Sequence, residues 1–305
     1  MMKNIYVVFI ALLITSITAC QKDVNPYITQ AQVVKIDSIR HPAIKNVAFI
    51  YNNEVYFLAD FASKPQKITD NGSTKKFIRM SHDHAKFAYK NVAGSIDIVD
   101  KTGKLMASLT QYNDIRNFDW SADDKTLYII NSDNVAFYGP AMKVPAIIYF
   151  TDYYDFISAA VSKNGDLVYL LRKYNFDALD QYQMVIRKAS GGDPVFYRAE
   201  ESGLPPMATI NFAANGMDMV LGFEGPGDDV SNVYLFDNMA QYPTYKFGFN
   251  SISTPAYQSN IKYMLGAYDD DAGNHLIGAV YLDTDIKDNN KTFAGYEGVK
   301  YLDWK

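Results

Sequence analysis

The sequence has 305 residues, which is enough for one large domain or two small ones. Its 29 Lys and Arg residues face 34 Asp and Glu residues, and this net charge of −5 argues against nucleic acid as a partner, because phosphate binding needs a basic surface. The one cysteine, Cys20, excludes an intrachain disulfide and a metal site built from cysteines.

The chain begins with an apolar run, "IYVVFIALLITSITA", at residues 5–19, directly after Lys3 and Asn4. A run of this length is typical of the core of a signal peptide and is short for a membrane span. We therefore predict a signal peptide at residues 1–19 and exclude it from the fold.

The run ends in Ile17-Thr18-Ala19-Cys20, which resembles the bacterial lipobox. The resemblance implies that Cys20 is the acylated (palmitate-bearing) residue of the mature lipoprotein, anchored by two or three acyl chains. The following "QKDVNP" resembles the export signal of surface lipoproteins of Bacteroidota-type bacteria, with a plain linker as the alternative. We expect an outer-membrane lipoprotein, periplasmic or surface-exposed, with residues 20–44 as tether and entry segment. An ordinary signal peptide or a buried helix that contains a cysteine is the alternative.

Five similar segments follow, each an alternating strand, a turn rich in Asp, Asn or Gly, and a more apolar strand. Their anchor positions lie 40, 41, 51 and 45 residues apart, which is the spacing of four-stranded propeller blades. These positions are Ser81, Ser121, Ser162, Ala213 and Gln258.

The first block, residues 45–69, matches only the second to fourth strands of such a unit. The missing strand is predicted at the other end of the chain, where "KYLDWK" aligns with "RNFDWS" and places Trp304 over Trp120. We therefore predict an all-β fold over residues 45–305, a six-bladed β-propeller closed by a C-terminal strand that completes the first blade.

"WSADDKTLYI" at residues 120–129, together with "SIDIVDKTGK" at residues 95–104, resembles the WD40-like repeats of TolB-type six-bladed β-propellers. The chain departs from that pattern at Ala122 and Asp124, where Pro and Gly are usual. TolB works as a binding scaffold beside an outer-membrane lipoprotein, and related propellers occur as subunits of peptidases and lyases. The resemblance implies a fold and leaves the activity open.

Signals for catalysis are few. No G-x-S-x-G motif is present, and the glycine-rich "GFEGPGDD" lacks a lysine and ends in two carboxylates that would repel phosphate. His82 and His84 lie in "SHDH", which we interpret as a solvated turn rather than a metal site. The alternative function is a propeller enzyme, a lyase or glycosidase, that uses carboxylates and His275.

One set of loops is longer than its counterparts. The loops between the second and third strands of the fourth to sixth blades share a face with the inter-blade connections, and both are rich in carboxylates and tyrosines. Tyrosines beside carboxylates suit a peptide or a sugar, so we expect a non-catalytic module that binds an envelope protein or glycan. The alternative is a rim of solvated hairpin tips. The predicted rim residues are Tyr153, Tyr154, Tyr174, Asp228, Asp229, Asp269 and Asp271.

No cofactor is predicted, except that oxygen ligands at one of these loops could suit Ca²⁺. The candidates are Asp269, Asp271 and Asn274.

Overall fold

The computed structural model consists of strands and their connections over the residues it describes. These are residues 44–60, 63–112, 114–132, 134–139, 148–149, 154–173, 181–192, 195–199, 208–212, 218–223, 230–236, 245–250, 252–258, 263–269, 275–281, 292–294 and 299–305. Within these ranges, no helix has the length and apolar content needed to cross a membrane.

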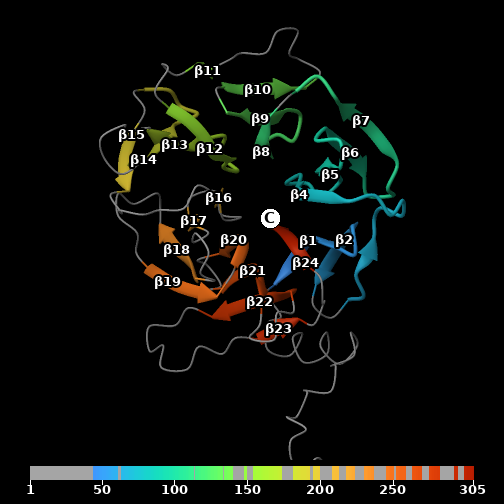
Figure 1. Cartoon of the computed structure of the whole chain (residues 1–305). Helices are drawn as coiled ribbons and strands as arrows, with labels where there is room; N and C mark the ends of the chain where they lie inside the picture. Colours follow the sequence, from blue (N-terminus) through green and yellow to red (C-terminus); the bar gives the residue numbers. More distant parts are fainter. Residues whose placement is uncertain are drawn as a thin grey trace, which may run out of the picture.

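The described strands form six antiparallel sheets of four strands each, arranged around a common centre (Figure 1). The first sheet consists of β24 (Val299–Trp304), β1 (Lys45–Tyr51), β2 (Glu54–Asp60) and β3 (Gln66–Lys67). The second consists of β4 (Lys75–Met80), β5 (Lys86–Asn91), β6 (Ile96–Asp100) and β7 (Leu105–Leu109). The third consists of β8 (Ile115–Trp120), β9 (Leu127–Asn131), β10 (Asn134–Tyr138) and β11 (Ile148–Tyr149).

The other three sheets repeat this order from the inside outward. The fourth consists of β12 (Tyr154–Val161), β13 (Leu167–Lys173), β14 (Gln181–Arg187) and β15 (Val195–Ala199). The fifth consists of β16 (Ala208–Phe212), β17 (Met219–Phe223), β18 (Val230–Phe236) and β19 (Tyr245–Asn250). The sixth consists of β20 (Ile252–Gln258), β21 (Tyr263–Asp269), β22 (His275–Tyr281) and β23 (Thr292–Ala294).

The ring is closed by the last strand, as the sequence predicted. β24 pairs with β1, with Val47 opposite Trp304 and Phe49 opposite Leu302. The innermost strands β4, β8, β12, β16, β20 and β24 also contact one another in succession, and β24 contacts both β20 and β4. Because every innermost strand has a neighbour on each side, the ring has no open junction.

One recurring turn joins the first two strands of the second, third and fourth sheets. In the second, third and fourth sheets, the residue three positions after the anchor serine is left-handed, with φ of 57° at His84, 55° at Asp124 and 85° at Gly165. The amide of this residue donates to the anchor carbonyl, at 2.9, 2.9 and 2.8 Å. His and Asp therefore occupy a conformation that glycine adopts without strain.

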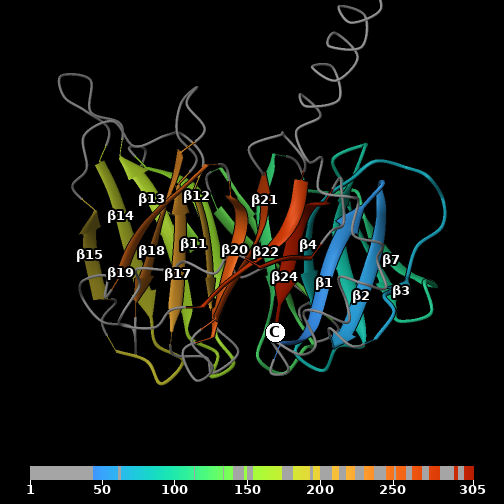
Figure 2. The same cartoon turned by 90° about the horizontal axis from the view of Figure 1, so that it is seen from below.

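The turns define the two ends of the ring. We call the end that carries the turns after β4, β8 and β12 the turn end. β24 runs in the same direction as these three strands, so Lys305, which follows it, lies at the turn end (Figure 2). The opposite end, where successive sheets are connected, is the inter-blade end. Apolar clusters lie between adjacent sheets, and one of them joins Leu265 of the sixth sheet to Trp304 and Phe49 of the first.

Candidate functional site

Charged side chains gather at the centre of the ring, at the turn end of the innermost strands. Asp303, Arg79 and Asp119 occupy the same position in β24, β4 and β8, two residues before the position of the anchor serine. All three are buried, with 2%, 1% and 1% of their surface exposed. Lys305, which follows β24, adds a fourth buried charged side chain. Buried charges are tolerated only where they are paired, as these four are. We call these four residues the central charge cluster.

The two aspartates join neighbouring sheets. Asp303 accepts a hydrogen bond from the Met80 amide in β4 at 2.7 Å, and Asp119 accepts one from the Val161 amide in β12 at 2.9 Å. Each carboxylate therefore satisfies a backbone donor on the next innermost strand, which has no ladder partner on that side. In this way the cluster fixes the order and spacing of the sheets.

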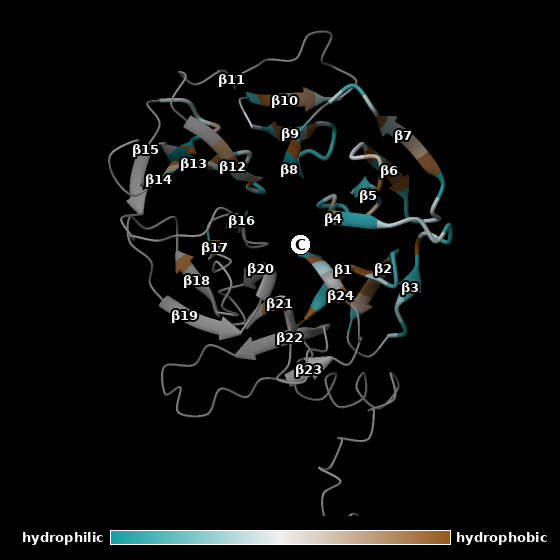
Figure 3. Ribbon diagram, viewed as in Figure 1, coloured by the Kyte–Doolittle hydropathy of each residue, from teal (hydrophilic) through white to brown (hydrophobic). Residues whose placement is uncertain are grey.

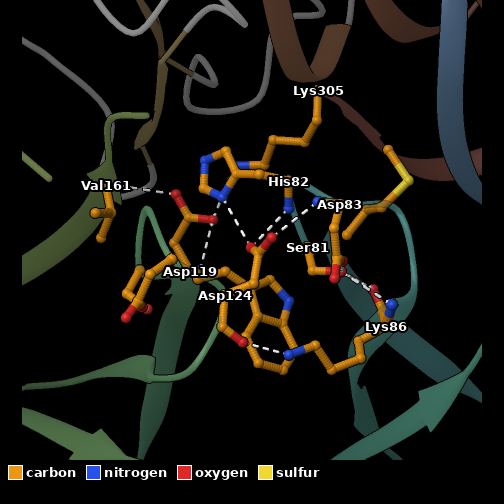
Figure 4. Close-up of polar contacts among 12 residues, drawn as sticks. Ser81, His82, Asp83, Lys86, Asp119, Asp124, Val161 and Lys305 are labelled. Carbon is orange, nitrogen blue, oxygen red and sulfur yellow. Dashed lines mark hydrogen bonds and ion pairs between the residues drawn. The ribbon is translucent and has the colours of Figure 1, made fainter. Parts of the chain in front are cut away.

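The two cations complete the pairing. The Lys305 ammonium lies 3.0 Å from Asp119 Oδ1, across the centre of the ring, and Arg79 Nη1 lies 3.8 Å from Asp303 Oδ1 (Figure 4 shows the first pair). Burial raises the pKa of Asp119, but the charges of Lys305 and Arg79, the hydrogen bond from the Val161 amide and the nearby His82 together outweigh burial, so its net pKa is lowered. Asp119 is therefore an ionised carboxylate at neutral pH.

A belt of polar side chains continues from the cluster around the ring. Arg79 Nη2 donates to Asn117 Oδ1 at 3.4 Å, and Asn117 Nδ2 donates to Ser158 Oγ at 2.8 Å. Ser158 Oγ in turn accepts a hydrogen bond from the Ile210 amide at 3.2 Å. These side chains thus link β24, β4, β8, β12 and β16. Among the described residues, Nε is the one nitrogen of the Arg79 guanidinium that lacks a hydrogen-bond partner.

A second contact joins the turns of the second and third sheets. Asp124 accepts hydrogen bonds from the amides of His82 and Asp83 at 2.7 and 2.8 Å, and its Oδ1 lies 3.0 Å from His82 Nδ1 (Figure 4). Lys86 donates to the Asp124 carbonyl and lies over the Trp120 ring, 4.7 Å from its centroid. This set of contacts is called the turn clasp.

The turn clasp changes the interpretation of the "SHDH" motif. The side chain of His82 is only 16% exposed, so this histidine is a partner of Asp124 and less solvated than the sequence suggested. His84 stacks on Phe57 of the first sheet, and burial lowers its pKa. Within the described residues, no three His, Asp or Glu side chains are placed to hold a metal ion.

The turn clasp yields a testable prediction. Burial raises the pKa of Asp124, but the hydrogen bonds from His82 and Asp83 lower it more, so its pKa is lowered on folding. This contribution to stability is therefore complete above the unfolded pKa of about 3.9 and is lost as the pH falls through the folded pKa. Asp124→Asn, which tolerates the left-handed backbone, should lower the unfolding free energy by about 1–2 kcal/mol at pH 7 in urea denaturation.

The difference between Asp124→Asn and the natural protein should shrink as the pH is lowered toward 3. Lys125→Ala is the matched control, because the Lys125 side chain is 73% exposed in the same turn and should leave the unfolding free energy nearly unchanged. Equal stabilities for Asp124→Asn and the natural protein at pH 7 would show that the clasp contributes nothing.

The predicted rim lies mostly outside the described residues. Two of its members are described at the level of the backbone: Tyr154 opens β12 and Asp269 ends β21, both at the inter-blade end. Asp269 stands opposite His275 in the sheet. Outside the described residues lie Cys20, Tyr153, Tyr174, Asp228, Asp229, Asp271 and Asn274.

The central charge cluster was not singled out from the sequence. The sequence carries a signal for its two aspartates, because the alignment of "KYLDWK" with "RNFDWS" places Asp303 over Asp119. Arg79 gave no such signal, since an arginine at the position of an aspartate looks like a departure from the repeat. Only the geometry shows that it pairs with Asp303 of the preceding strand.

Comparison with known proteins finds likeness in structure alone. No family model matches the sequence, and no curated protein matches it. Among solved structures, TolB from Acinetobacter baumannii superposes with a TM-score of 0.60 and 14% identity over 92% of this chain and 73% of that chain.

Two further structures share the fold. A chain of a nidogen/laminin complex superposes with a TM-score of 0.58 and 10% identity over 84% of this chain and 97% of its own length. A functionally unknown protein from Desulfotomaculum acetoxidans superposes with a TM-score of 0.53 and 10% identity, over 85% of this chain and 98% of its own. Identities this low establish the fold and leave function open. By fold, the chain is a TolB-like β-propeller.

Proposed function

We propose that this chain is a lipid-anchored propeller of the cell envelope that acts as a non-catalytic binding or scaffold module for a protein or a glycan. The observation that carries this proposal is the pairing at the centre of the ring. There Asp119 and Asp303 are occupied by Lys305, Arg79 and backbone amides of neighbouring strands. Because these side chains are engaged in holding the sheets together, we infer that the loops at the ends of the ring bind the partner.

The inter-blade end is the favoured binding face. The enlarged loops of the fourth to sixth sheets belong to this end, and the described Tyr154 and Asp269 backbones support a common location for the predicted rim. The likeness to a chain found in a nidogen/laminin complex supports a protein partner as the first choice. A glycan that stacks on tyrosines is the second choice.

Binding at the rim can be tested with paired variants. Tyr153→Ala/Tyr154→Ala or Asp228→Asn/Asp229→Asn should weaken capture of the partner by about 1–3 kcal/mol per key contact. The measurement is a pull-down from solubilised envelopes alongside a glycan array. Asp123→Ala, at the opposite end of the ring, is the control and should leave capture intact. Capture lost with Asp123→Ala and retained by the rim variants would locate the site at the turn end.

Lipid attachment is tested separately. Cys20→Ser should leave the protein unprocessed or released from membranes, because acylation at this sulfur supplies the anchor. Detergent partitioning and the mass of the mature N-terminus are the measurements. Unchanged partitioning in Cys20→Ser, with no lipid mass on the natural protein, would refute the anchor.

A further inference from the structure

The outer edge of the second sheet exposes two consecutive apolar side chains. Leu105 and Met106 open β7 and are 56% and 57% exposed. Successive side chains of a regular strand point to opposite faces of the sheet. Here the pairing of β7 with β6 contains a bulge: Leu105 pairs with Val99 and Ala107 with Ile98, so Met106 has no residue opposite it. This bulge leaves both side chains on the perimeter of the ring, where Figure 3 shows a hydrophobic start to β7.

Exposed lysines flank this apolar pair. Lys101 and Lys104 lie in the turn that precedes β7, and Lys64 lies in the adjacent connection of the first sheet. The one carboxylate of this turn, Asp100, accepts hydrogen bonds from the amides of Thr102 and Lys104 at 2.8 and 3.1 Å. The apolar pair and the three lysines are called the β7 corner, and it is basic on a chain whose net charge is −5.

The position of the β7 corner is fixed by neighbouring turns. The Gln66 side chain of β3 donates to the Lys101 carbonyl at 3.0 Å, which joins the corner to the first sheet. Gly103, with φ of 83°, approaches the Ile68 carbonyl so closely that a Cβ atom would lie 2.0 Å from its oxygen. The corner is therefore held in place by its neighbours before any partner binds.

The β7 corner lies at the end of the ring where the chain enters the first sheet. The Lys101 amide donates to the Ala85 carbonyl of a turn-end loop at 3.1 Å. Lys45, the first residue of β1, is at the same end, because its carbonyl accepts a hydrogen bond from Trp304 Nε1 at 2.7 Å. The chain thus enters the first sheet at the end that carries the corner.

We propose that the β7 corner is a membrane-contact site for an anionic phospholipid surface. Leu105 and Met106 would enter the boundary between headgroups and acyl chains, while Lys64, Lys101 and Lys104 meet headgroup phosphates. The bulge disfavours addition of a strand from another protein, because it disrupts the hydrogen-bond ladder at this edge. The flanking lysines favour an anionic lipid surface. The biological setting rests on the proposed lipid anchor, but the lipid contact is tested without it.

The experiment uses residues 21–305, which contain every described strand of the ring, and vesicles of phosphatidylethanolamine and phosphatidylglycerol. The natural sequence should cosediment with these vesicles at low salt and lose binding as the salt rises. Leu105→Ser/Met106→Ser should bind about tenfold more weakly. Lys101→Gln/Lys104→Gln should also bind about tenfold more weakly, and its remaining binding should depend less on salt.

Val92→Ser is the matched control, because Val92 is 76% exposed but lies in the β5–β6 connection, at the inter-blade end. It should bind like the natural sequence. The proposal is overturned if the natural protein stays in the supernatant, or if the β7 variants cosediment as Val92→Ser does. The proposal is also overturned if the β7 corner binds an envelope protein but the protein does not bind the vesicles. Since no variant here carries lipid, these outcomes are independent of the Cys20→Ser result.

Discussion

Deleting residues 299–304 should abolish the folded monomer. The deletion removes Val299, Leu302 and Trp304 from a buried cluster, at about 1.5–3 kcal/mol each, together with the ladder to β1. It also leaves the Met80 amide without the Asp303 carboxylate. The sum approaches the whole stability of a typical domain, about 5–15 kcal/mol, and the freed edge of β1 would be open to self-association.

Thermal unfolding and size-exclusion chromatography measure this effect. Trp304→Ala is a graded version, which should cost about 3–5 kcal/mol, while Tyr138→Ala at a half-exposed site should cost far less. A synthetic peptide covering residues 298–305 should partly restore the melting transition of the truncated chain. A truncated protein that stays monomeric and melts at the natural temperature would show that β24 does not close the ring.

Glu54→Gln should be a strongly destabilising isosteric substitution. The Lys75 ammonium is fully buried and lies 3.0 Å from Glu54 Oε2, with the Asn53 carbonyl at 2.7 Å and Asn71 Oδ1 at 2.7 Å. Glu54 also accepts hydrogen bonds from Thr69 and from the backbone amides of Asn71 and Gly72. This group ties the first sheet to the connection that leads into the second.

The substitution leaves the Lys75 charge buried without its carboxylate, which typically costs about 3–5 kcal/mol. Glu54→Gln combined with Lys75→Met should recover a large part of that loss, because it removes both charges together. Urea denaturation of the two single variants and the double variant gives the coupling energy. Additive losses in the double variant would contradict the pairing.

The fold was predictable because the repeat is local and the closure is a sequence match. Each anchor serine is followed by a turn whose chemistry fixes a hairpin, and the DW pair near the end of the chain has the same form as Asp119-Trp120. The centre of the ring was not predictable in the same way. The pairing of Lys305 with Asp119 joins residues 186 positions apart and depends on how the sheets meet in space.

The candidate binding rim is a harder case. Loop lengths predicted it, but loops of unequal length follow no repeat, so the sequence does not predict which contacts Tyr153 or Asp228 would make. The β7 corner escaped prediction for a related reason. Its exposure results from a one-residue bulge, and "KLMASLT" alone is typical of an ordinary outer strand.

The hydrogen bond from Trp304 to the Lys45 carbonyl spans 259 positions of the sequence, and this has a kinetic consequence. A chain that emerges from its N-terminus can form the hairpins of the second to fifth sheets early, because their contacts are local. The first sheet stays one strand short until residues 299–304 are available to pair with β1. Folding therefore ends with a slow, long-range docking step, and β1 presents an unpaired inner edge throughout that interval.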